Sequence, residues 1–331
     1  MTKPRCNQIC LESTPYYHIV SRCVRRAFLC GVDQYSGESF EHRREWVTER
    51  LRILAEVYCI DVAAYAVMSN HYHLVLHIDQ TTALKLTESE VIHRWKKIFN
   101  MPLLIQRKEK GEEITEAEQL AIDKIIRSWK KRLYDISWFM RCLNEPLARM
   151  ANKEDNCTGH FWEGRYKSQA LLDDAALLTC MSYVDLNPIR ARMAYTPEAS
   201  DYTSIQSRIR AQDKQQTRCH PIKLQKFIGD ESMQKEEGIQ FSLHDYLQLV
   251  DYTGRAILEN KRGHISDKIP PILNRLGIKQ NAWLNGVTTF EKRFQLAAGA
   301  VDKLQAMATQ LQQKWLKGCG TARLLYKAAP T

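Results

Sequence analysis

The hydrophobic pattern at the start of the chain changes from strand-like to helix-like and back. Residues Tyr16–Val24 are rich in β-branched and aromatic side chains, which predicts a strand. Across residues 39–58 the apolar positions recur at helical spacing, which predicts an amphipathic helix. Asp61–Met68 and His71–Ile78 then predict two strands joined by a tight turn. The pattern therefore indicates a unit that mixes strands with helices.

A strongly charged stretch follows, and its periodicity is helical. Thr87–Tyr134 carries helical spacing in two pieces, which predicts a helical insertion at about residues 80–135. The next segment, Ile136–Asn152, predicts a further helix. Pro146 should disturb that helix, because proline lacks the N–H that a helix interior uses.

The rest of the chain predicts one more strand and then helices. Gly164–Leu172 has the composition of a strand, and Ala175–Leu186 predicts a helix. The polar stretch 196–223 predicts a linker. We therefore expect a first domain at residues 1–195 and an all-α C-terminal domain at residues 224–331.

Charge and cysteine usage narrow the functional class. The 48 Lys and Arg residues outnumber the 38 Asp and Glu residues, so the net charge is +10, which fits a polyanionic partner as well as a basic enzyme. The cysteines are scattered without a C-x-x-C pair, and the first residues are polar. We expect reduced thiols in a cytoplasmic protein, with no membrane association because the apolar runs are short.

The predicted strand at His71–Ile78 carries candidate metal ligands. Side chains alternate between the two faces of a strand, so His71, His73 and His77 should share one face, with Tyr72 on the other. Two imidazoles at i and i+2 can hold one divalent ion, which could polarise a phosphate oxygen. The alternative is three surface histidines on a half-solvated strand.

Three strings in the sequence resemble one protein family. Met68-Ser-Asn-His-Tyr-His-Leu-Val-Leu76 resembles the His-hydrophobic-His hairpin of the IS200/IS605-like transposases, especially of their REP-associated branch. Gly159-His-Phe-Trp-Glu-Gly-Arg-Tyr-Lys-Ser168 and Tyr183-Val-Asp-Leu-Asn-Pro-Ile-Arg-Ala191 resemble two further signatures of that branch. The resemblance covers roughly Tyr16 to Met193, with the insertion as an extra.

The resemblance implies a fold, a partner and a reaction. It implies an α+β, ferredoxin-like antiparallel sheet with helices packed on one face. It also implies that a tyrosine attacks single-stranded or hairpin DNA with help from Mg²⁺ or Mn²⁺, which leaves a 5′-phosphotyrosyl link and a free 3′-OH.

The family's nucleophile position departs from the pattern. Leu147 stands where the resemblance places the tyrosine, and leucine cannot attack phosphorus. Asn152 keeps the place of a polar third metal ligand, although asparagine is also common at a helix C-terminus. Tyr166 is a candidate replacement nucleophile, and Tyr134 is the next, although packing explains the first and surface exposure the second.

Aromatic and cationic residues gather in the second and third strings. Such mixtures hold single-stranded DNA by stacking its bases and pairing its phosphates, whereas a solvated surface is the commoner place for any one of these cations. The candidate DNA-binding residues are His160, Trp162, Arg165, Lys167, Arg190 and Arg192.

Three functions remain open on the sequence alone. The first is a REP-associated tyrosine transposase relative that recognises hairpin or single-stranded DNA, with strand-cleavage chemistry that is degenerate or rearranged. The second is a catalytically inactive, domesticated DNA-binding protein, which Leu147 favours. The third is a metal-dependent hydrolase that uses His71, His73, His77 and a water nucleophile. The basic C-terminal region could grip a DNA flank or form a homodimer.

Overall fold

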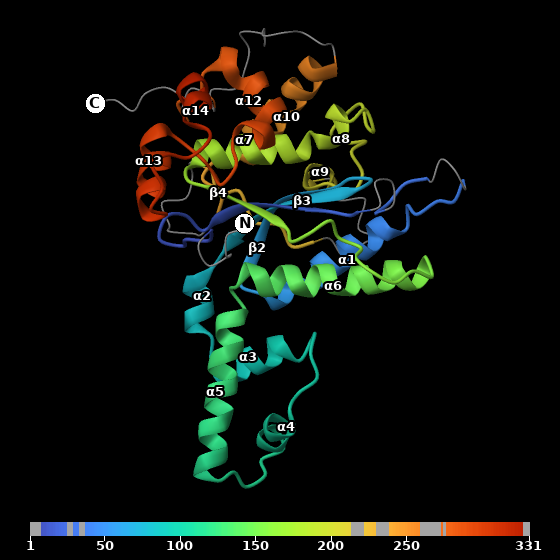
Figure 1. Ribbon diagram of the computed structural model, residues 1–331, viewed down its shortest axis with the longest axis vertical. Coiled ribbons are helices and arrows are strands. Elements are labelled where there is room, and N and C mark those ends of the chain that lie inside the picture. The colour runs from blue at the N-terminus through green and yellow to red at the C-terminus, as the bar shows by residue number, and fades with distance from the viewer. Residues whose placement is uncertain are drawn as a thin grey trace.

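A five-stranded sheet lies at the centre of the molecule (Figure 1). The computed structural model describes residues 8–24, 29–32, 37–212, 222–229, 238–258, 273 and 276–326. The strand order is β2-β3-β1-β4-β5, and neighbours are antiparallel except for the parallel pair β4–β5. The strands are β1 Tyr16–Arg22, β2 Ile60–Val67, β3 His71–Ile78, β4 Lys167–Leu171 and β5 Ala297–Ala298.

The first four strands form a ferredoxin-like core. The chain runs β1, α1 (Arg43–Val57), β2, β3, α6 (Ile136–Glu154), β4, and the antiparallel order β4-β1-β3-β2 is that of the split βαβ motif. Helices α1 and α6 pack against each other on one face of the sheet (Figure 1). The predicted α+β class is therefore confirmed.

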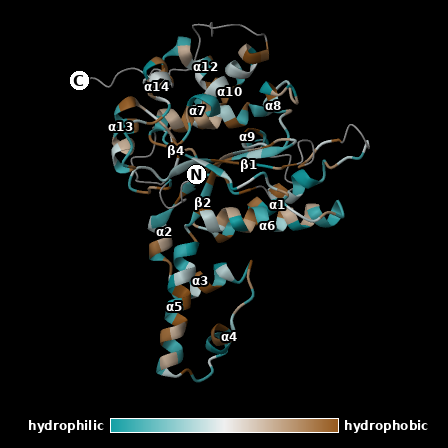
Figure 2. Ribbon diagram, in the orientation of Figure 1, coloured by the Kyte–Doolittle hydropathy of each residue, from teal (hydrophilic) through white to brown (hydrophobic). Residues whose placement is uncertain are grey.

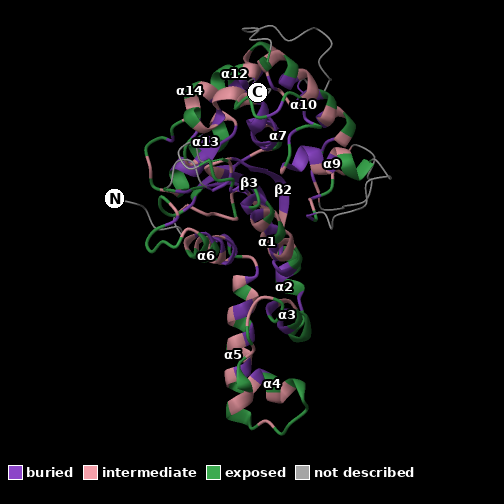
Figure 3. Ribbon diagram, turned by 90° about the vertical axis from the view of Figure 1, so that its right-hand side faces the viewer, coloured by how far each residue is buried: buried purple, intermediate pink, exposed green. Residues whose placement is uncertain are grey.

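In addition to the predicted helices on one face, helices cover the opposite face of the sheet. Helix α7 (Asp174–Asp185) packs on β2, β3 and β4, and α12 (Gln280–Arg293) packs on α7. Every residue of α7 from Ala176 to Asp185 is buried, as Figure 3 shows in purple. A helix that is buried along nearly its whole length has to be covered on more than one side, and the last third of the chain supplies that cover.

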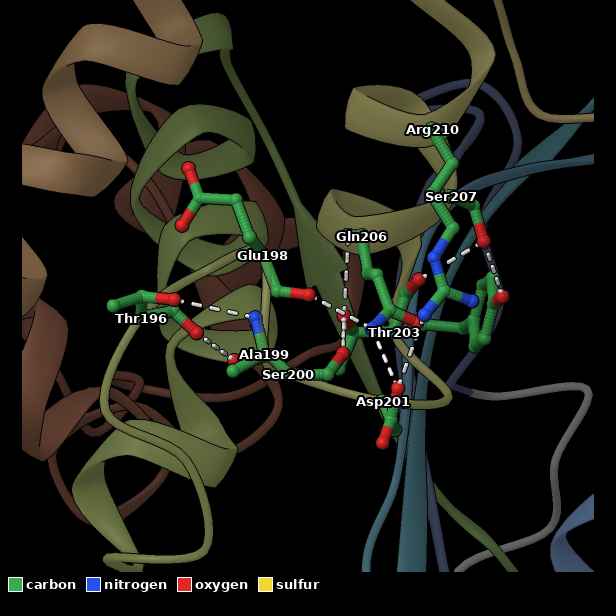
Figure 4. Close-up of polar contacts among 10 residues, drawn as sticks. Thr196, Glu198, Ala199, Ser200, Asp201, Thr203, Gln206, Ser207 and Arg210 are labelled. Atoms are coloured by element: carbon green, nitrogen blue, oxygen red, sulfur yellow. Dashed lines mark hydrogen bonds and ion pairs between the residues drawn. The ribbon is translucent and has the colours of Figure 1, made fainter. Parts of the chain in front are cut away.

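The predicted linker at residues 196–223 is folded where it is described, and residues 213–221 lie outside the described part. Helix α9 (Ser204–Gln212) packs on β2. The Gln206 amide donates to the Glu198 carbonyl at 2.9 Å and to Asp201 at 2.6 Å (Figure 4). The Arg210 guanidinium donates to the same carboxylate at 3.3 Å (Figure 4). These bonds fold the segment on itself instead of leaving it extended, and the packing of α9 on β2 holds it at the sheet edge.

The last third of the chain packs on the core and is not wholly helical. It contributes β5 to the sheet, and α10 (Leu243–Leu258) packs on both α8 (Asn187–Arg190) and α12. The hydroxyl of Tyr246 donates to the buried Asp185 carboxylate at 2.5 Å, which links α10 to the end of α7. The helices not yet placed are α13 Val301–Gln310 and α14 Cys319–Leu325.

The stretch between β3 and α6 forms a helical arm that projects away from the sheet (Figure 1). Thr87 and Thr115 begin two of its helices with capping boxes, in which Glu90 and Glu118 complete the reciprocal bonds. The arm consists of α2 Gln80–Lys85, α3 Glu88–Trp95, α4 Leu103–Glu109 and α5 Glu116–Arg132.

The arm and α6 are amphipathic. Hydrophilic and hydrophobic positions alternate along α5 and α6 (Figure 2). In α5 the buried residues are Ile122, Ile126 and Trp129, which recur every three or four positions on the side that packs against α3.

Among the described helices, none combines the length and the apolar character that a membrane span requires.

Helix α6 continues through Pro146, contrary to the sequence-based expectation of a disturbed helix. Proline at this position leaves the carbonyl of Cys142, four residues earlier, without its helical N–H donor. The Nε of Arg50 on α1 donates to that carbonyl at 2.8 Å. The guanidinium therefore replaces the missing donor, and it joins the two helices at the same point.

We predict that the Arg50 bond compensates for Pro146. Arg50→Met should lower the free energy of unfolding by about 1–2 kcal/mol, because a partly buried carbonyl loses its donor. In a Pro146→Ala background the cost should shrink, since alanine at this position would supply the N–H. A double-mutant cycle by denaturant unfolding measures this coupling. Equal costs in both backgrounds would show that the bond has no compensating role.

Candidate functional site

The strand parity of β3 places its first two histidines on the same face of the sheet. The ring centroids of His71 and His73 are 4.8 Å apart. Tyr72 points the other way, where its hydroxyl donates to Asn144 on α6. The histidine face is the one that α7 and α12 cover, so His73 is fully buried and His71 is half-buried. The face that carries these histidines is therefore enclosed.

A further histidine, His18, which the sequence analysis did not identify as part of the site, determines which ring nitrogens carry a proton. His18 on β1 has its Nδ1 3.2 Å from the Gln169 amide oxygen and its Nε2 3.0 Å from Nδ1 of His73. The amide oxygen can only accept, so in the neutral chain His18 donates to Gln169 and accepts from His73. His71 likewise places Nδ1 2.6 Å from the Asn70 side-chain oxygen. His71 and His73 therefore both keep an unprotonated Nε2.

Burial keeps these imidazoles neutral. Desolvation lowers the pKa of His18 and lowers that of His73 further, and neighbouring positive charges add to the effect on His73. For His71 burial and the Arg22 guanidinium together lower the pKa to about 4. A lowered histidine pKa favours the uncharged ring at pH 7. Neutral imidazole with a free Nε2 is the form that acts as a metal ligand or a proton acceptor.

Three side chains from α7, α8 and α12 face the histidines from the covering layer. The ring centroid of Tyr183 lies 5.5 Å from that of His73, and its hydroxyl donates to Glu291 at 3.0 Å. The Arg190 guanidinium lies 4.0 Å from the centroid of the Tyr183 ring. Tyr183 and Arg190 belong to one of the three strings, whereas Glu291 comes from the last third, where no sequence signal marked it.

The donor set for a divalent ion is incomplete in the described part of the chain. His71 and His73 offer two nitrogens, and the buried Nε2 of His73 has no hydrogen-bond partner there. Yet no three His, Cys, Asp or Glu side chains among the described residues are arranged to hold a metal. Asn152 lies on α6, on the other side of the sheet, and its amide donates to the Gly159 carbonyl at 3.0 Å. The metal roles of these residues remain predictions.

The hydroxyl of Tyr166 lies away from the histidines. It is 3.0 Å from Ser137 Oγ on α6, whereas the next residue, Lys167, pairs with Val20 and points to the histidine face. Leu147, at the expected nucleophile position, is buried on α6 with 3% exposure. The structure thus brings neither Leu147 nor Tyr166 to the His71–His73 pair, and the hydroxyl beside that pair belongs to Tyr183.

Cations from three segments meet at the end of the sheet where His71 lies. Arg22 ends β1 opposite His71, Lys167 begins β4, and Arg190 approaches from α8; each acts electrostatically on the His71 ring. We call Arg22, Lys167, Arg190 and the neighbouring exposed Arg165 the cationic sheet end. Sequence reasoning identified three of them and missed Arg22.

The other predicted DNA-binding residues, Trp162, His160 and Arg192, do not belong to the cationic sheet end. Trp162 forms an isolated β-bridge with Cys23 just after β1, and its indole N–H donates to the Asn144 backbone carbonyl at 2.8 Å. Much of the Trp162 side chain is therefore engaged in packing. His160 is exposed in the same loop. Arg192 is exposed after α8.

Comparison with known proteins finds similarity to a solved structure but none to a protein-family model or a curated protein. A solved structure of a REP-associated tyrosine transposase bound to a REP hairpin is similar at 10% identity and a TM-score of 0.35. The match covers 67% of this chain and 92% of that one.

We predict a structural effect for Tyr166→Phe. Loss of the hydroxyl that contacts Ser137 should lower the free energy of unfolding by about 0.5–1.5 kcal/mol. DNA affinity should not change, because the hydroxyl faces α6. Denaturant unfolding and a DNA-binding titration of the same variant test both parts. Unchanged stability together with lost DNA binding would show that this hydroxyl contacts DNA and not Ser137 on α6.

Proposed function

We propose that this protein binds single-stranded or hairpin DNA at the cationic sheet end. The observation that carries the proposal is the meeting of the three family-like strings at one place. The hairpin string supplies His71 and His73, the second string supplies Lys167, and the third supplies Tyr183 and Arg190. Residues that are far apart in the sequence thus surround one partly exposed imidazole with cations that suit phosphates.

We further propose that the chain is a diverged relative of the REP-associated tyrosine transposases. The three strings and the ferredoxin-like strand order support this proposal. Mg²⁺ or Mn²⁺ would be the ion if the β3 histidines bind one. His71 and His73 would hold such an ion with two nitrogens, and no complete set of His, Cys, Asp or Glu ligands lies around them among the described residues.

The inactive DNA-binding protein remains the main alternative for the chemistry. It is favoured by Leu147, which has no nucleophilic atom and is buried. The hydrolase that uses a water nucleophile is less well supported. His73 is fully buried, and His77 is engaged 3.0 Å from Asp61 at the far end of the strand.

We predict that DNA binding depends on the cationic sheet end and on salt. A double variant, Arg22→Gln with Lys167→Gln, should weaken binding to hairpin and single-stranded DNA. The slope of log affinity against log salt should fall by roughly 0.7 for each single-strand phosphate that the protein no longer neutralises. Arg52→Gln is the matched control, since Arg52 pairs with Glu49 and Glu56 on α1. Salt-insensitive binding, or equal affinity for plain duplex, would contradict the proposal.

We also predict that DNA incubated with Mn²⁺ gives no covalent protein–DNA adduct on a denaturing gel. Leu147 cannot attack phosphorus, Tyr166 faces α6, and the buried Tyr183 hydroxyl is bound to Glu291. A slow-migrating band would overturn this prediction. Its loss in Tyr183→Phe but not in Tyr166→Phe would then identify the hydroxyl beside the histidines as the nucleophile.

A further inference from the structure

A pocket of about 500 Å³ opens where the helical arm meets α6. Helix α6 contributes one stripe of residues that face away from the sheet, at positions 138, 141, 142, 145, 146 and 149, spaced alternately three and one apart. The arm contributes residues from α3, α5 and the segment after α3. We call this the arm pocket. The three strings of the sequence do not include any of it.

Its wall is a set of stacked aromatic rings. Trp95 stacks on Trp129 with ring centroids 5.3 Å apart and on Phe99 at 4.5 Å. Trp138 lies edge-on to Phe99, with ring centroids 6.5 Å apart. Trp95 and Trp129 are buried and hold the base of the arm together, whereas Phe99 and Trp138 are half-exposed. Two aromatic rings therefore remain accessible from the pocket.

Arginines surround these rings. The guanidinium carbon of Arg132 lies 4.0 Å from the Trp138 ring centroid and that of Arg141 5.2 Å from it. Arg50 and Arg149 also line the pocket, and Glu145, the one carboxylate among its described lining residues, bonds to Arg141 and Arg149. Four arginines against one glutamate leave this lining with three positive charges in excess.

A second, basic hollow of about 700 Å³ adjoins the arm pocket. The two share Arg132 and Trp138, so this pair of side chains lies between them. A row of cations lines the second hollow along α5, and Asp135 is the one carboxylate among the described residues around it. These cations are Lys124, Arg127, Lys130 and Lys131. A positively charged track thus passes the exposed rim of the aromatic wall.

We propose that the arm pocket holds an unstacked base of single-stranded DNA on Trp138 and Phe99, with the neighbouring phosphates along the α5 cations. The inference rests on the proposed DNA-binding function and adds a second contact to it. The Arg132 guanidinium lies over the Trp138 ring, and such a layered pair presents a planar surface on which a base can stack, while flanking cations track the phosphates. An acidic peptide would use the cations but would leave the paired ring and guanidinium faces without a planar partner.

The test compares two single-stranded probes. One is a labelled oligothymidylate and the other is an abasic oligomer of equal length, which keeps the phosphates but lacks bases. Trp138→Leu should weaken binding of the first by about 5- to 100-fold, the loss associated with one stacked base. It should leave binding of the second unchanged. Arg132→Gln should weaken both, and Arg52→Gln should weaken neither. Photo-crosslinking of a 5-iodouracil probe should label Phe99 or Trp138.

The outcomes separate this inference from the proposed function. Arg132→Gln leaves the buried rings in place, so it reports on binding even if Trp138→Leu lowers stability. If both arm variants bind like wild type while the Arg22/Lys167 variant does not, the arm pocket is overturned and the cationic sheet end stands. The reverse pattern supports the arm pocket and overturns the sheet end. Equal loss for both probes in Trp138→Leu would also overturn base stacking.

Discussion

The hydrogen-bonded chain from Gln169 through His18 to His73 is the constraint on which the site depends. It lies on a sheet face that α7 and α12 enclose, where unpaired polar groups are costly. Because the amide oxygen fixes which nitrogen of His18 carries the proton, it also fixes the proton of His73. Enclosure thus sets both the charge and the orientation of the imidazoles, and it leaves one nitrogen of His73 unsatisfied in the described part of the chain.

Helix α6 connects the sheet to the arm and has a different task on each side. Asn144 binds the Tyr72 hydroxyl and Ser21 on the sheet side, whereas Trp138 and Arg141 face the arm pocket. Pro146 would weaken such a helix, and the guanidinium of Arg50 restores the lost bond from α1. Leu147 is buried on the packed side of α6, which is consistent with a supporting role for this helix.

The two proposed DNA contacts differ in chemistry. The cationic sheet end surrounds an imidazole with Arg22, Lys167 and Arg190, and it suits phosphates. The arm pocket combines accessible rings with guanidinium groups, and it suits a base. Helix α6 begins beside the arm pocket and ends where the chain enters the loop that pairs with β1 through Trp162. Helix α6 therefore leads along the chain from the arm pocket toward the segment that carries Arg165 and Lys167.

Local pattern determined much of this protein. Alternation along β3 placed His71 and His73 on one face, and helical periodicity identified the arm, because both depend only on near neighbours. The sequence could not show that α7 and α12 enclose that face, that His18 and Glu291 reach it, or that Arg50 supports Pro146. Each of these depends on contacts between residues far apart in the chain, and burial, which sets the pKa of a histidine, exists only once those segments pack.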